Sequence, residues 1–547
     1  MRFLFLLLFV LISQINFAQV LSHKNGTYTR ADSLRGSLRP ERTNYDVLKY
    51  NLYVKVDIAN KFISGVNKIS FNTTNNLEVM QVDLFENMQV DSITYRGKNL
   101  NYQREFNAVF ITFEEAIQKD KERTINFYFS GKPIVAKRAP WDGGFIFTKD
   151  QNGKDWVSVA VQGTGASLWY PNKDHLSDEP EEVEIHVAAP NGLMNVSNGR
   201  FLGKEEIEDN YTVWNWKVTN PINNYNVILN IGDYVKFSDQ YKDLDLDYYV
   251  LSYNLEKAKK SFKEVIPMMD CFYDKIGPYP FPEDSYKLVE TPFLGMEHQS
   301  AVAYGNHFTK GYMGSDLSAT GVGLKWDYII IHETGHEWFG NSITAKDIAD
   351  MWIHESFTSY TEAIYIECRW GLEDALTYLN GTRKTMVSNQ TPIIGDYGVN
   401  SEGSGDMYFK GANMINTLRF TLNNDEKWWA TLKKFTATYK HSQIDTPTVI
   451  KFFEKETKLP LEGFFNQYLQ QTALPQLEFK KEKNKIYYKW ITDAKNFNMP
   501  VNLIVNQQEI RVYPTNSWQK LSKKIAKKDF EVNLKKFYIT TNLEEIK

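Results

Sequence analysis

The amino-acid sequence predicts an α+β protein made of several domains. With 547 residues, the chain is longer than one hydrophobic core supports. Its hydrophobic pattern also changes twice: alternating runs of branched and aromatic residues come first, a helical period follows, and alternating runs return near the end. We therefore expect an N-terminal β domain, a mainly helical domain and a small C-terminal β domain.

The expected N-terminal β domain covers residues 44–245. Runs such as YDVLKYNLYVKVDI and EVEIHVAAP alternate apolar and polar side chains, and Asn, Gly, Asp or Pro separates one run from the next. Such runs are typical of strands. The period changes at about Leu251, which predicts a mainly helical domain over residues 246–472. Strand patterns after Pro475 predict the C-terminal β domain, residues 473–547.

The first residues have the composition of an export signal. MRFLFLLLFVLISQINFAQ begins with one Arg, continues with an apolar run over residues 3–12, and ends in small and polar residues. A run this short does not span a bilayer, whereas this order fits a secretory signal peptide. We expect a signal peptide over residues 1–18, an extension over residues 19–43, and an exported protein, either periplasmic or secreted. Later segments lack the apolar length of a membrane span.

Charge and cysteine content narrow the possible partners. The 63 basic and 67 acidic residues nearly balance, so nucleic acid is not an expected partner. Two cysteines, Cys271 and Cys368, are too few for a disulfide framework. The sequence leaves open whether they are bonded, and two buried free thiols are the simpler expectation. It does not predict an oligomeric state.

The stretch IHETGHEWFG, residues 331–340, carries two histidines four positions apart. On a helix His332 and His336 lie one turn above each other, so both imidazoles can face one metal ion, and zinc favours such ligands. By composition alone an H-E-x-x-H string arises about once in a hundred such chains. Packing on an amphipathic helix is the alternative for the two histidines.

A second helical pattern supplies the missing ligand. Glu355 follows His336 with eighteen residues between them, and a helix hairpin brings it to the metal as third protein ligand. The fourth position then stays open for water, as in catalytic sites. Glu362, on the same face, can hold one histidine through its other nitrogen, and Glu333 is the natural general base. A solvated helix face, the alternative for both later glutamates, does not explain the joint spacing.

These motifs resemble the aminopeptidase N family of zinc metallopeptidases, the gluzincin group that includes leukotriene epoxide hydrolase. HETGHEWFGN and HESFTSYTE follow the family pattern of the zinc helix and of the helix with the third ligand. Beyond the ligands, the residues that match are Trp338, Gly340, Asn341, Tyr360 and Glu362. The sequence departs at His354 and Ser356, where the family usually has Asn and Gly.

The resemblance also implies residues that bind the substrate amine. FLGMEHQ corresponds to the family element G-x-M-E-N and retains Gly295, Met296 and Glu297, although Leu294 and His298 replace the first Gly and the Asn. A buried ammonium group needs such a counter-charge, which also excludes blocked N-termini.

Two further residues follow from the family pattern. Gln162, nine residues before Pro171, matches a family Gln or Glu that touches the amine. Tyr408 begins the family motif Y-x-K-G and implies a hydroxyl that donates to the oxyanion of the reaction.

The family resemblance implies the fold and the reaction together. The expected architecture is an N-terminal β saddle or sandwich, a thermolysin-like catalytic domain with one zinc ion, and a small C-terminal β domain, without room for the helical superhelix of larger members. The expected activity is removal of the N-terminal residue from peptides with a free α-amine, by attack of metal-activated water.

Three alternatives remain open. A thermolysin-type zinc endopeptidase shares the ligands but needs no amine-binding acid. A binding or scaffold protein that has lost catalysis, and an epoxide hydrolase, are more remote. The sequence does not predict the preferred N-terminal residue.

Overall fold

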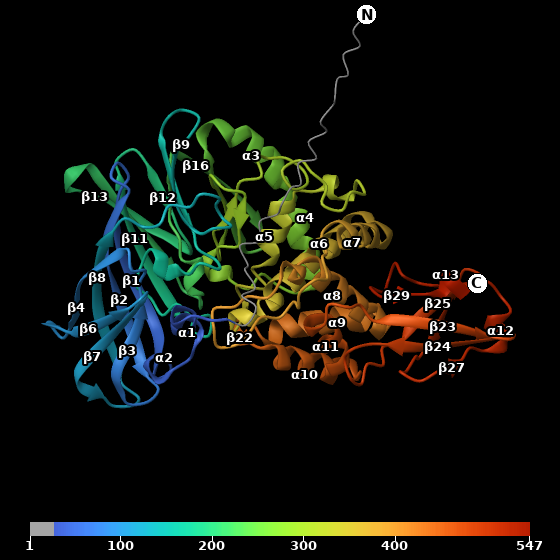
Figure 1. Cartoon of the computed structure of the whole chain (residues 1–547). Helices are drawn as coiled ribbons and strands as arrows, with labels where there is room; N and C mark the ends of the chain where they lie inside the picture. The colour runs from blue at the N-terminus through green and yellow to red at the C-terminus, as the bar shows by residue number, and fades with distance from the viewer. Residues whose placement is uncertain (1–26, 547) are drawn as a thin grey trace, which may run out of the picture.

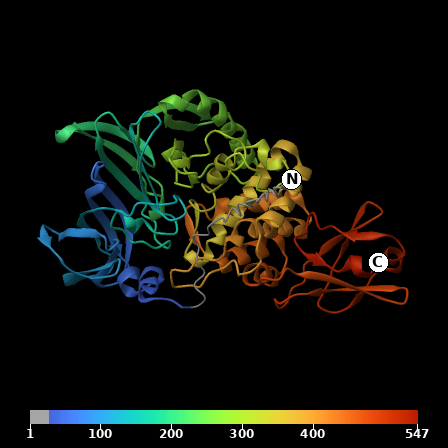
Figure 2. The ribbon, with the colours of Figure 1, turned by 45° about the horizontal axis from the view of Figure 1, so that its top comes forward.

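The structure is a computed structural model that describes residues 27–546. Strands gather at one end of the molecule, helices in the middle, and a second group of strands at the other end (Figures 1 and 2). The chain is therefore of mixed α and β structure, as expected. The expected signal peptide, residues 1–18, lies outside the described residues. None of the helices between residues 27 and 546 has the length and apolar composition that a bilayer span needs.

An eight-stranded sheet forms the centre of the N-terminal region, with strand order β13-β14-β11-β1-β2-β8-β4-β5. Its long strands alternate buried and exposed side chains, because one face covers the core. A three-stranded sheet, β3-β7-β6, and a four-stranded sheet, β12-β15-β10-β9, complete the region. The strands are β1 (Tyr45–Asp57), β2 (Phe62–Thr73), β3 (Leu77–Asp83), β4 (Met88–Tyr95), β5 (Lys98–Asn99), β6 (Asn101–Glu105), β7 (Ala108–Ile117), β8 (Glu122–Gly131), β9 (Gly144–Lys149), β10 (Asp155–Ala160), β11 (Glu182–Pro190), β12 (Met194–Val196), β13 (Arg200–Ile207), β14 (Tyr211–Val218) and β15 (Asn230–Gly232).

Two short helices precede the first strand, in the expected extension. They are α1 (Arg30–Gly36) and α2 (Pro40–Thr43). Helix α1 starts with a capping box, in which Thr29 and Asp32 each satisfy the other's backbone amide. A threonine followed three residues later by an acidic residue can indicate the start of a helix. In the sequence, this pair was the local feature that could have predicted α1.

Helix α1 lies against a loop, residues 394–404, in the connection between two helices of the helical region, α7 and α8. The amide of Asn400 donates to the carbonyl of Asp32 at 3.1 Å. A Cβ on Gly36 would lie 2.1 Å from the backbone carbonyl carbon of Val399. Only glycine allows so close an approach of two backbones.

A five-stranded sheet joins the N-terminal region to the helices. Its order is β16-β17-β18-β20-β19. The strands β16 (Tyr234–Tyr241) and β17 (Leu244–Leu251) pair with each other, and β17 also pairs with β18 (Tyr286–Glu290), which lies beyond the first helices. The expected domain boundary at residue 245 therefore falls inside this sheet. Its two remaining strands are β19 (Gly295–Met296) and β20 (Val302–Tyr304).

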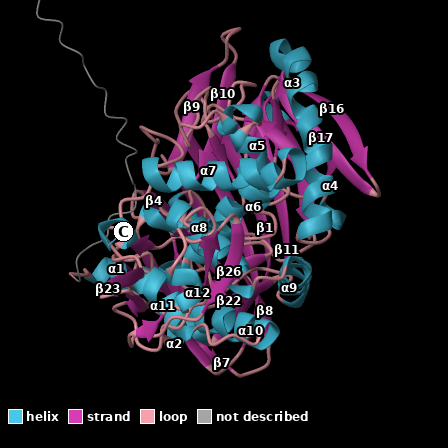
Figure 3. Ribbon diagram, turned by 90° about the vertical axis from the view of Figure 1, so that its right-hand side faces the viewer, coloured by secondary structure: helices cyan, strands magenta, loops and turns pink. Residues whose placement is uncertain are grey.

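Nine helices between residues 255 and 470 form the middle of the described chain. Helix α6 contacts α5, α7 and α8, and all four helices lie near the centre of Figure 3. Two short strands, β21 (Ile343–Ala345) and β22 (Ser442–Ile444), pair in parallel. The helices are α3 (Leu255–Ser261), α4 (Val265–Lys275), α5 (Tyr328–Gly335), α6 (Trp352–Trp370), α7 (Leu372–Thr385), α8 (Phe409–Leu422), α9 (Asp425–Thr438), α10 (Thr446–Thr457) and α11 (Glu462–Gln470).

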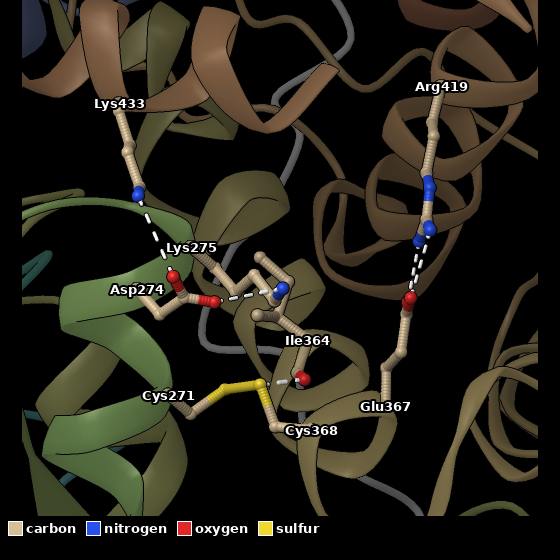
Figure 4. Close-up of a disulfide and its surroundings, with 8 residues drawn as sticks. All are labelled: Cys271, Asp274, Lys275, Ile364, Glu367, Cys368, Arg419 and Lys433. Carbon is tan, nitrogen blue, oxygen red and sulfur yellow. Dashed lines mark hydrogen bonds and ion pairs between the residues drawn. A yellow bond between two sulfur atoms is a disulfide. The ribbon is translucent and has the colours of Figure 1, made fainter. Parts of the chain in front are cut away.

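A disulfide joins α4 to α6 (Figure 4). Cys271 and Cys368 are bonded, with their Cα atoms 6.0 Å apart. The expectation of two free thiols is therefore wrong. Each cysteine alone has the surroundings of a buried thiol. The sequence pattern does not show that two cysteines 97 residues apart meet where their helices are in contact.

Two small sheets form the C-terminal region. Their orders are β27-β24-β23-β29 and β26-β25-β28. The region packs on the helices partly through Arg383, whose guanidinium donates to the carbonyl of Leu534 at 2.9 Å. The elements are β23 (Gln476–Glu482), β24 (Lys485–Ile491), β25 (Val501–Val505), β26 (Gln508–Val512), β27 (Gln519–Lys520), α12 (Lys523–Ala526), β28 (Phe530–Val532), β29 (Thr540–Thr541) and α13 (Leu543–Ile546).

Candidate active site

Helices α5 and α6 bring the three candidate metal ligands together. His332 lies within α5, His336 directly follows its last residue, and Glu355 lies in the first turn of α6. One ligand atom from each side chain lies within 4.8 Å of the other two. All three residues are buried. The spacing of the two motifs on packed helices thus produces one compact donor set.

Hydrogen bonds orient both imidazoles. Nδ1 of His332 lies 2.7 Å from Oε1 of Glu362, and the hydroxyl of Tyr378 donates to Oε2 of Glu362 at 2.7 Å. Nδ1 of His336 lies 2.9 Å from the carbonyl oxygen of Phe339. Each ring therefore uses Nδ1 for the protein and turns Nε2 toward Glu355.

The donor set fits a zinc ion. Oε2 of Glu355 is buried and accepts no hydrogen bond from the described residues, although Nε2 of His336 lies 3.4 Å away. Two imidazole nitrogens and a carboxylate oxygen are ligands that zinc prefers, with a fourth position left free. Burial lowers the pKa of His332 to about 3, which keeps this imidazole neutral as a ligand must be.

The charges at His336 also favour a cation at this point. Burial lowers its pKa, but the carboxylates of Glu355 and Glu297 outweigh burial and raise the pKa to about 10. The surrounding acids thus stabilise positive charge beside Nε2 of His336. A divalent cation supplies the same charge.

Glu333 lies beside the donor set and close to β19, Gly295–Met296, which precedes Glu297. A Cβ on Gly295 would lie 2.9 Å from Oε1 of Glu333, so glycine at this position leaves room for the carboxylate. Burial, followed by the charge of Glu297, raises the pKa of Glu333 well above its ordinary value. A carboxylate with a raised pKa accepts a proton more readily.

Residues from three parts of the chain surround the carboxylate of Glu297. Gln162, in the N-terminal region, donates from Nε2 to Oε1 of Glu297. The hydroxyl of Tyr225 donates to the same oxygen at 3.2 Å. Asn341, which follows the zinc motif, holds the backbone carbonyl of Glu297 at 2.7 Å. Burial raises the pKa of Glu297, so an arriving ammonium group would find a poorly solvated acid.

Tyr225 was missed in the sequence. It lies in a segment with ordinary turn composition, PINNYNV, and 32 tyrosines give no reason to choose it. The adjacent Asn226 donates to Oδ1 of Asn341 at 2.8 Å. Asn341 was among the motif residues. Its contact with Asn226, the neighbour of Tyr225, could have indicated Tyr225, but this contact is visible only in the structure.

Tyr408 stands at the start of α8 and faces the donor set. Its ring stacks on His332 with 6.1 Å between ring centroids. Burial, followed by the charge of Glu355, raises the pKa of Tyr408 well above its ordinary value, so the hydroxyl stays protonated and can donate. Gly411 of the same motif lies against Ser356, where a Cβ on the glycine would meet Oγ at 1.9 Å.

The structure explains the residues that depart from the family pattern. Ser356 donates to the carbonyl of Met407, one residue before Tyr408, at 2.7 Å. His354 accepts from the amide of Ala345 at 2.8 Å. His298 is fully buried, and burial lowers its pKa to about 3, so it is a neutral ring next to Glu297 in the chain.

A pocket of about 260 Å³ opens onto these groups. It contains the three ligand candidates and Glu333, and it extends past Gln162, Glu297 and Met296. Its walls include two residues that were not predicted, Trp141 and Glu402. Apart from Glu362, which lies behind His332, the residues proposed from the sequence thus line one cavity.

Comparisons with known proteins agree with this geometry. Residues 256–468 match the Peptidase family M1 domain. The chain is 20% identical to a probable aminopeptidase 2 of Sulfurisphaera tokodaii over 487 residues, which cover 84% of this chain and 59% of that protein. It is 24% identical to a probable aminopeptidase 1 of Saccharolobus solfataricus over 342 residues, or 61% of this chain and 41% of that protein. The chain spans less than two thirds of the length of either relative.

Solved structures resemble the fold over most of the chain. An M1 zinc metallopeptidase mutant from Deinococcus radiodurans, bound to a Tyr-Ser-Ala substrate, has a TM-score of 0.65 at 17% identity and covers 81% of this chain and 98% of that chain. A two-domain M1 zinc metallopeptidase mutant bound to L-tryptophan has a TM-score of 0.67 at 17% identity, with 80% and 96% covered.

The family match covers the helical region that holds the three candidate metal ligands. The match to the Peptidase family M1 domain over residues 256–468 agrees with the resemblance of the motifs to the aminopeptidase N family.

Proposed function

We propose that this protein is a zinc-dependent aminopeptidase that removes the N-terminal residue from peptides with a free α-amine. The observation that carries the proposal is the buried carboxylate of Glu297, held by Gln162 and Tyr225 in the same pocket as the three ligand candidates. The match to the Peptidase family M1 domain and the aminopeptidase names of the relatives support the same activity.

The residues divide the reaction between them. His332, His336 and Glu355 would hold one zinc ion, which would supply a Lewis acid able to polarise the substrate carbonyl and to lower the pKa of a water molecule. Glu333 takes the proton of that water and returns it to the leaving amine, for which its raised pKa is suited.

Binding and orientation complete the mechanism. Glu297 and Gln162 bind the substrate ammonium, and Gly295 and Met296 line the strand edge beside it. The protonated hydroxyl of Tyr408 donates to the oxygen that becomes negative as the carbonyl is attacked. Glu362 fixes the ring of His332 through Nδ1.

The architecture that accompanies this activity is part of the proposal. We assign residues 44–245 to a β saddle or sandwich domain, residues 246–472 to a thermolysin-like catalytic domain, and residues 473–547 to a small β domain. The order of strands, helices and strands supports three regions, and β17 (Leu244–Leu251) contains the boundary between the first two. Export through the signal peptide, to the periplasm or the medium, rests on residues 1–18 alone, and N-terminal sequencing of the mature protein tests it.

A zinc endopeptidase is the main competitor, and a specific observation argues against it. An endopeptidase needs the peptide chain to continue past the scissile bond on both sides. Here a buried acid with two hydrogen-bond donors occupies the pocket on one side. Such an acid is suited to an ammonium group and disfavours an uncharged amide.

A panel of aminoacyl chromogenic substrates tests the function. We expect hydrolysis by the zinc-loaded protein, loss of hydrolysis with a chelator, and recovery when zinc returns. Peptides with free and acetylated N-termini form the matched pair. Equal cleavage of both peptides would favour an endopeptidase, and stoichiometric zinc without any hydrolysis would favour a non-catalytic protein.

A further inference from the structure

Glu402 is the carboxylate in the pocket that the proposed mechanism does not use. It lies on the loop of residues 394–404, ahead of Tyr408, and its side chain is half-buried. It lines the site pocket, and it also lines a second cavity of about 400 Å³ beside α1. Gly163 is the other residue common to both cavities. Glu402 thus stands where the two cavities meet.

The position of Glu402 relates it to the first residue of a substrate. Its Oε1 lies 3.6 Å from the point where a Cβ of Gly163 would be. Gly163 is one peptide unit, about 3.8 Å between Cα atoms, from Gln162, which is bonded to Glu297. The side chain of the first residue and its ammonium group branch from one Cα. Glu402 therefore lines the same cavity as the residues that would hold the ammonium group.

The carboxylate of Glu402 has no partner that would make it a structural group. Within residues 27–546, no donor forms a hydrogen bond to it and no basic group lies within 4.0 Å of it. Arg35, whose charge acts on it from α1, instead donates to the carbonyl of Gly163 at 2.7 Å. No contact within the described residues thus ties this carboxylate to the fold.

The charges around Glu402 favour a cation. Burial raises its pKa to about 8, Arg35 opposes this rise, and the carboxylates of Glu355 and Glu297 add to it. A cationic group placed beside Glu402 restores its ionised form. The cavity that it lines also has apolar side chains in its walls, among them Trp141 and Met407. Arginine and lysine combine an aliphatic stem with a charged end, which matches such a wall.

We propose that Glu402 determines specificity by binding the cationic side chain of an N-terminal arginine or lysine. This inference rests on the proposed aminopeptidase function. It names a substrate class within that function: peptides that begin with a basic residue. The guanidinium or ammonium group would form a charge-assisted hydrogen bond with the carboxylate, while Glu297 and Gln162 hold the α-amine.

Arginyl and citrullinyl coumarin amides test the proposal without any substitution. Citrulline has nearly the shape of arginine but no charge. We expect kcat/KM of the zinc-loaded protein for the arginyl substrate to exceed that for the citrullinyl one by about 10- to 100-fold, the effect of one hydrogen bond to a charged group. A ratio within about threefold of one would overturn the proposal.

Glu402→Gln then locates the effect. We expect this variant to lower the arginyl-to-citrullinyl ratio by about 10-fold or more, because the amide cannot pair with a cation. Glu114→Gln is the matched control: it makes the same change in charge on β7, at a side chain that is 73% exposed, and should leave the ratio unaltered. If Glu402→Gln has the same arginyl-to-citrullinyl ratio as the unmodified protein, the assignment of Glu402 is wrong.

Failure of the two proposals is distinguishable. If the zinc-loaded protein hydrolyses methionyl and leucyl substrates but does not discriminate arginine from citrulline, only the role of Glu402 is wrong. If it hydrolyses no aminoacyl substrate at all, the aminopeptidase function is wrong, and the role of Glu402 falls with it.

Discussion

The carboxylates of Glu297 and Glu355 serve different purposes although both are buried in one pocket. Glu355 has a bare oxygen facing two imidazoles, and Glu297 has two donors from the N-terminal region on one oxygen. The first arrangement suits a metal ion and the second suits an ammonium group. Metal binding and substrate binding are therefore separable by substitution.

Replacing Glu297 should impair substrate binding without impairing metal binding. We expect Glu297→Ala to lower kcat/KM for substrates with a free α-amine by about 100-fold or more, because the ammonium group loses its buried counter-charge. Zinc content, measured by atomic absorption, should match that of the unmodified protein. Tyr225→Phe is the graded companion, with an expected loss of about fivefold from one hydrogen bond. Parallel loss of zinc and activity in Glu297→Ala would contradict the assigned role.

Residue spacing predicted part of the site, and the reason is local. His332, His336, Glu355 and Glu362 lie on two helices, where sequence distance fixes which side chains share a face. Tyr225 lies in a single 3-10 turn, Asn224–Asn226, and Glu402 lies in a loop, where no helical period relates sequence distance to position. Gln162 was found only through the family pattern. Side chains outside the two helices therefore required either the family pattern or the structure.

A disulfide between Cys271 and Cys368 links α4 to α6 covalently. Both helices carry core side chains, and α6 also carries Glu355 and Glu362. The disulfide constrains the unfolded chain by closing a long loop, because its cysteines are 97 positions apart. It fixes one end of the helix that presents the third ligand.

Removing this disulfide should destabilise the protein. For the Cys271→Ser, Cys368→Ser double variant we expect the free energy of unfolding to fall by about 3–5 kcal/mol, measured by urea denaturation. The single variant Cys368→Ser should behave like the double variant, because either change opens the loop. Unaltered stability in both would mean that the bond contributes nothing to the folded state.

At the level of elements, strands and helices were largely predictable, and their partners were not. Alternation predicted the long strands β1 and β2, because one face of each is buried. Pairing of β16 with β17 crosses the expected boundary at residue 245, and pairing of β17 with β18 depends on a contact between distant segments. Helix α1 lay in a stretch with too few apolar residues for a period, so only its capping residues could have indicated it.

The whole molecule should be more stable with its metal. An ion that binds only the folded chain stabilises it by about 4 kcal/mol when its free concentration is a thousandfold above Kd. We expect zinc to raise the melting temperature of chelator-treated protein and magnesium to leave it unaltered. Glu355→Gln should reduce the zinc effect. An equal response of this variant and the unmodified protein would argue against Glu355 as a ligand.

Acid should weaken the junction between α1 and the N-terminal sheets. Burial, followed by the charge of Arg42, lowers the pKa of His175 from 6.5 to about 3, and its Nε2 lies 3.3 Å from the carbonyl oxygen of Gly36. Below pH 6.5 His175 binds a proton in the unfolded chain but stays neutral in the folded chain until the pH approaches 3. The stability that neutral His175 contributes is therefore present above pH 6.5 and is lost as the pH falls toward 3.

The size of this effect follows from the same linkage. Between pH 7 and pH 5 the loss amounts to about 2 kcal/mol. Urea denaturation at both values should show a smaller pH dependence for His175→Gln than for the unmodified protein. Identical pH dependence in the two proteins would rule out His175 as the group that titrates.

The contact between Gly36 and Val399 couples two segments that lie far apart in the sequence. Because no side chain fits between the two backbones, a larger residue at position 36 must be accompanied by a rearranged loop. An insertion in residues 394–404 likewise needs a matching change in α1. For protein engineering, these segments form one exchangeable unit: a loop grafted from a relative to alter Glu402 should be transferred together with its N-terminal partner.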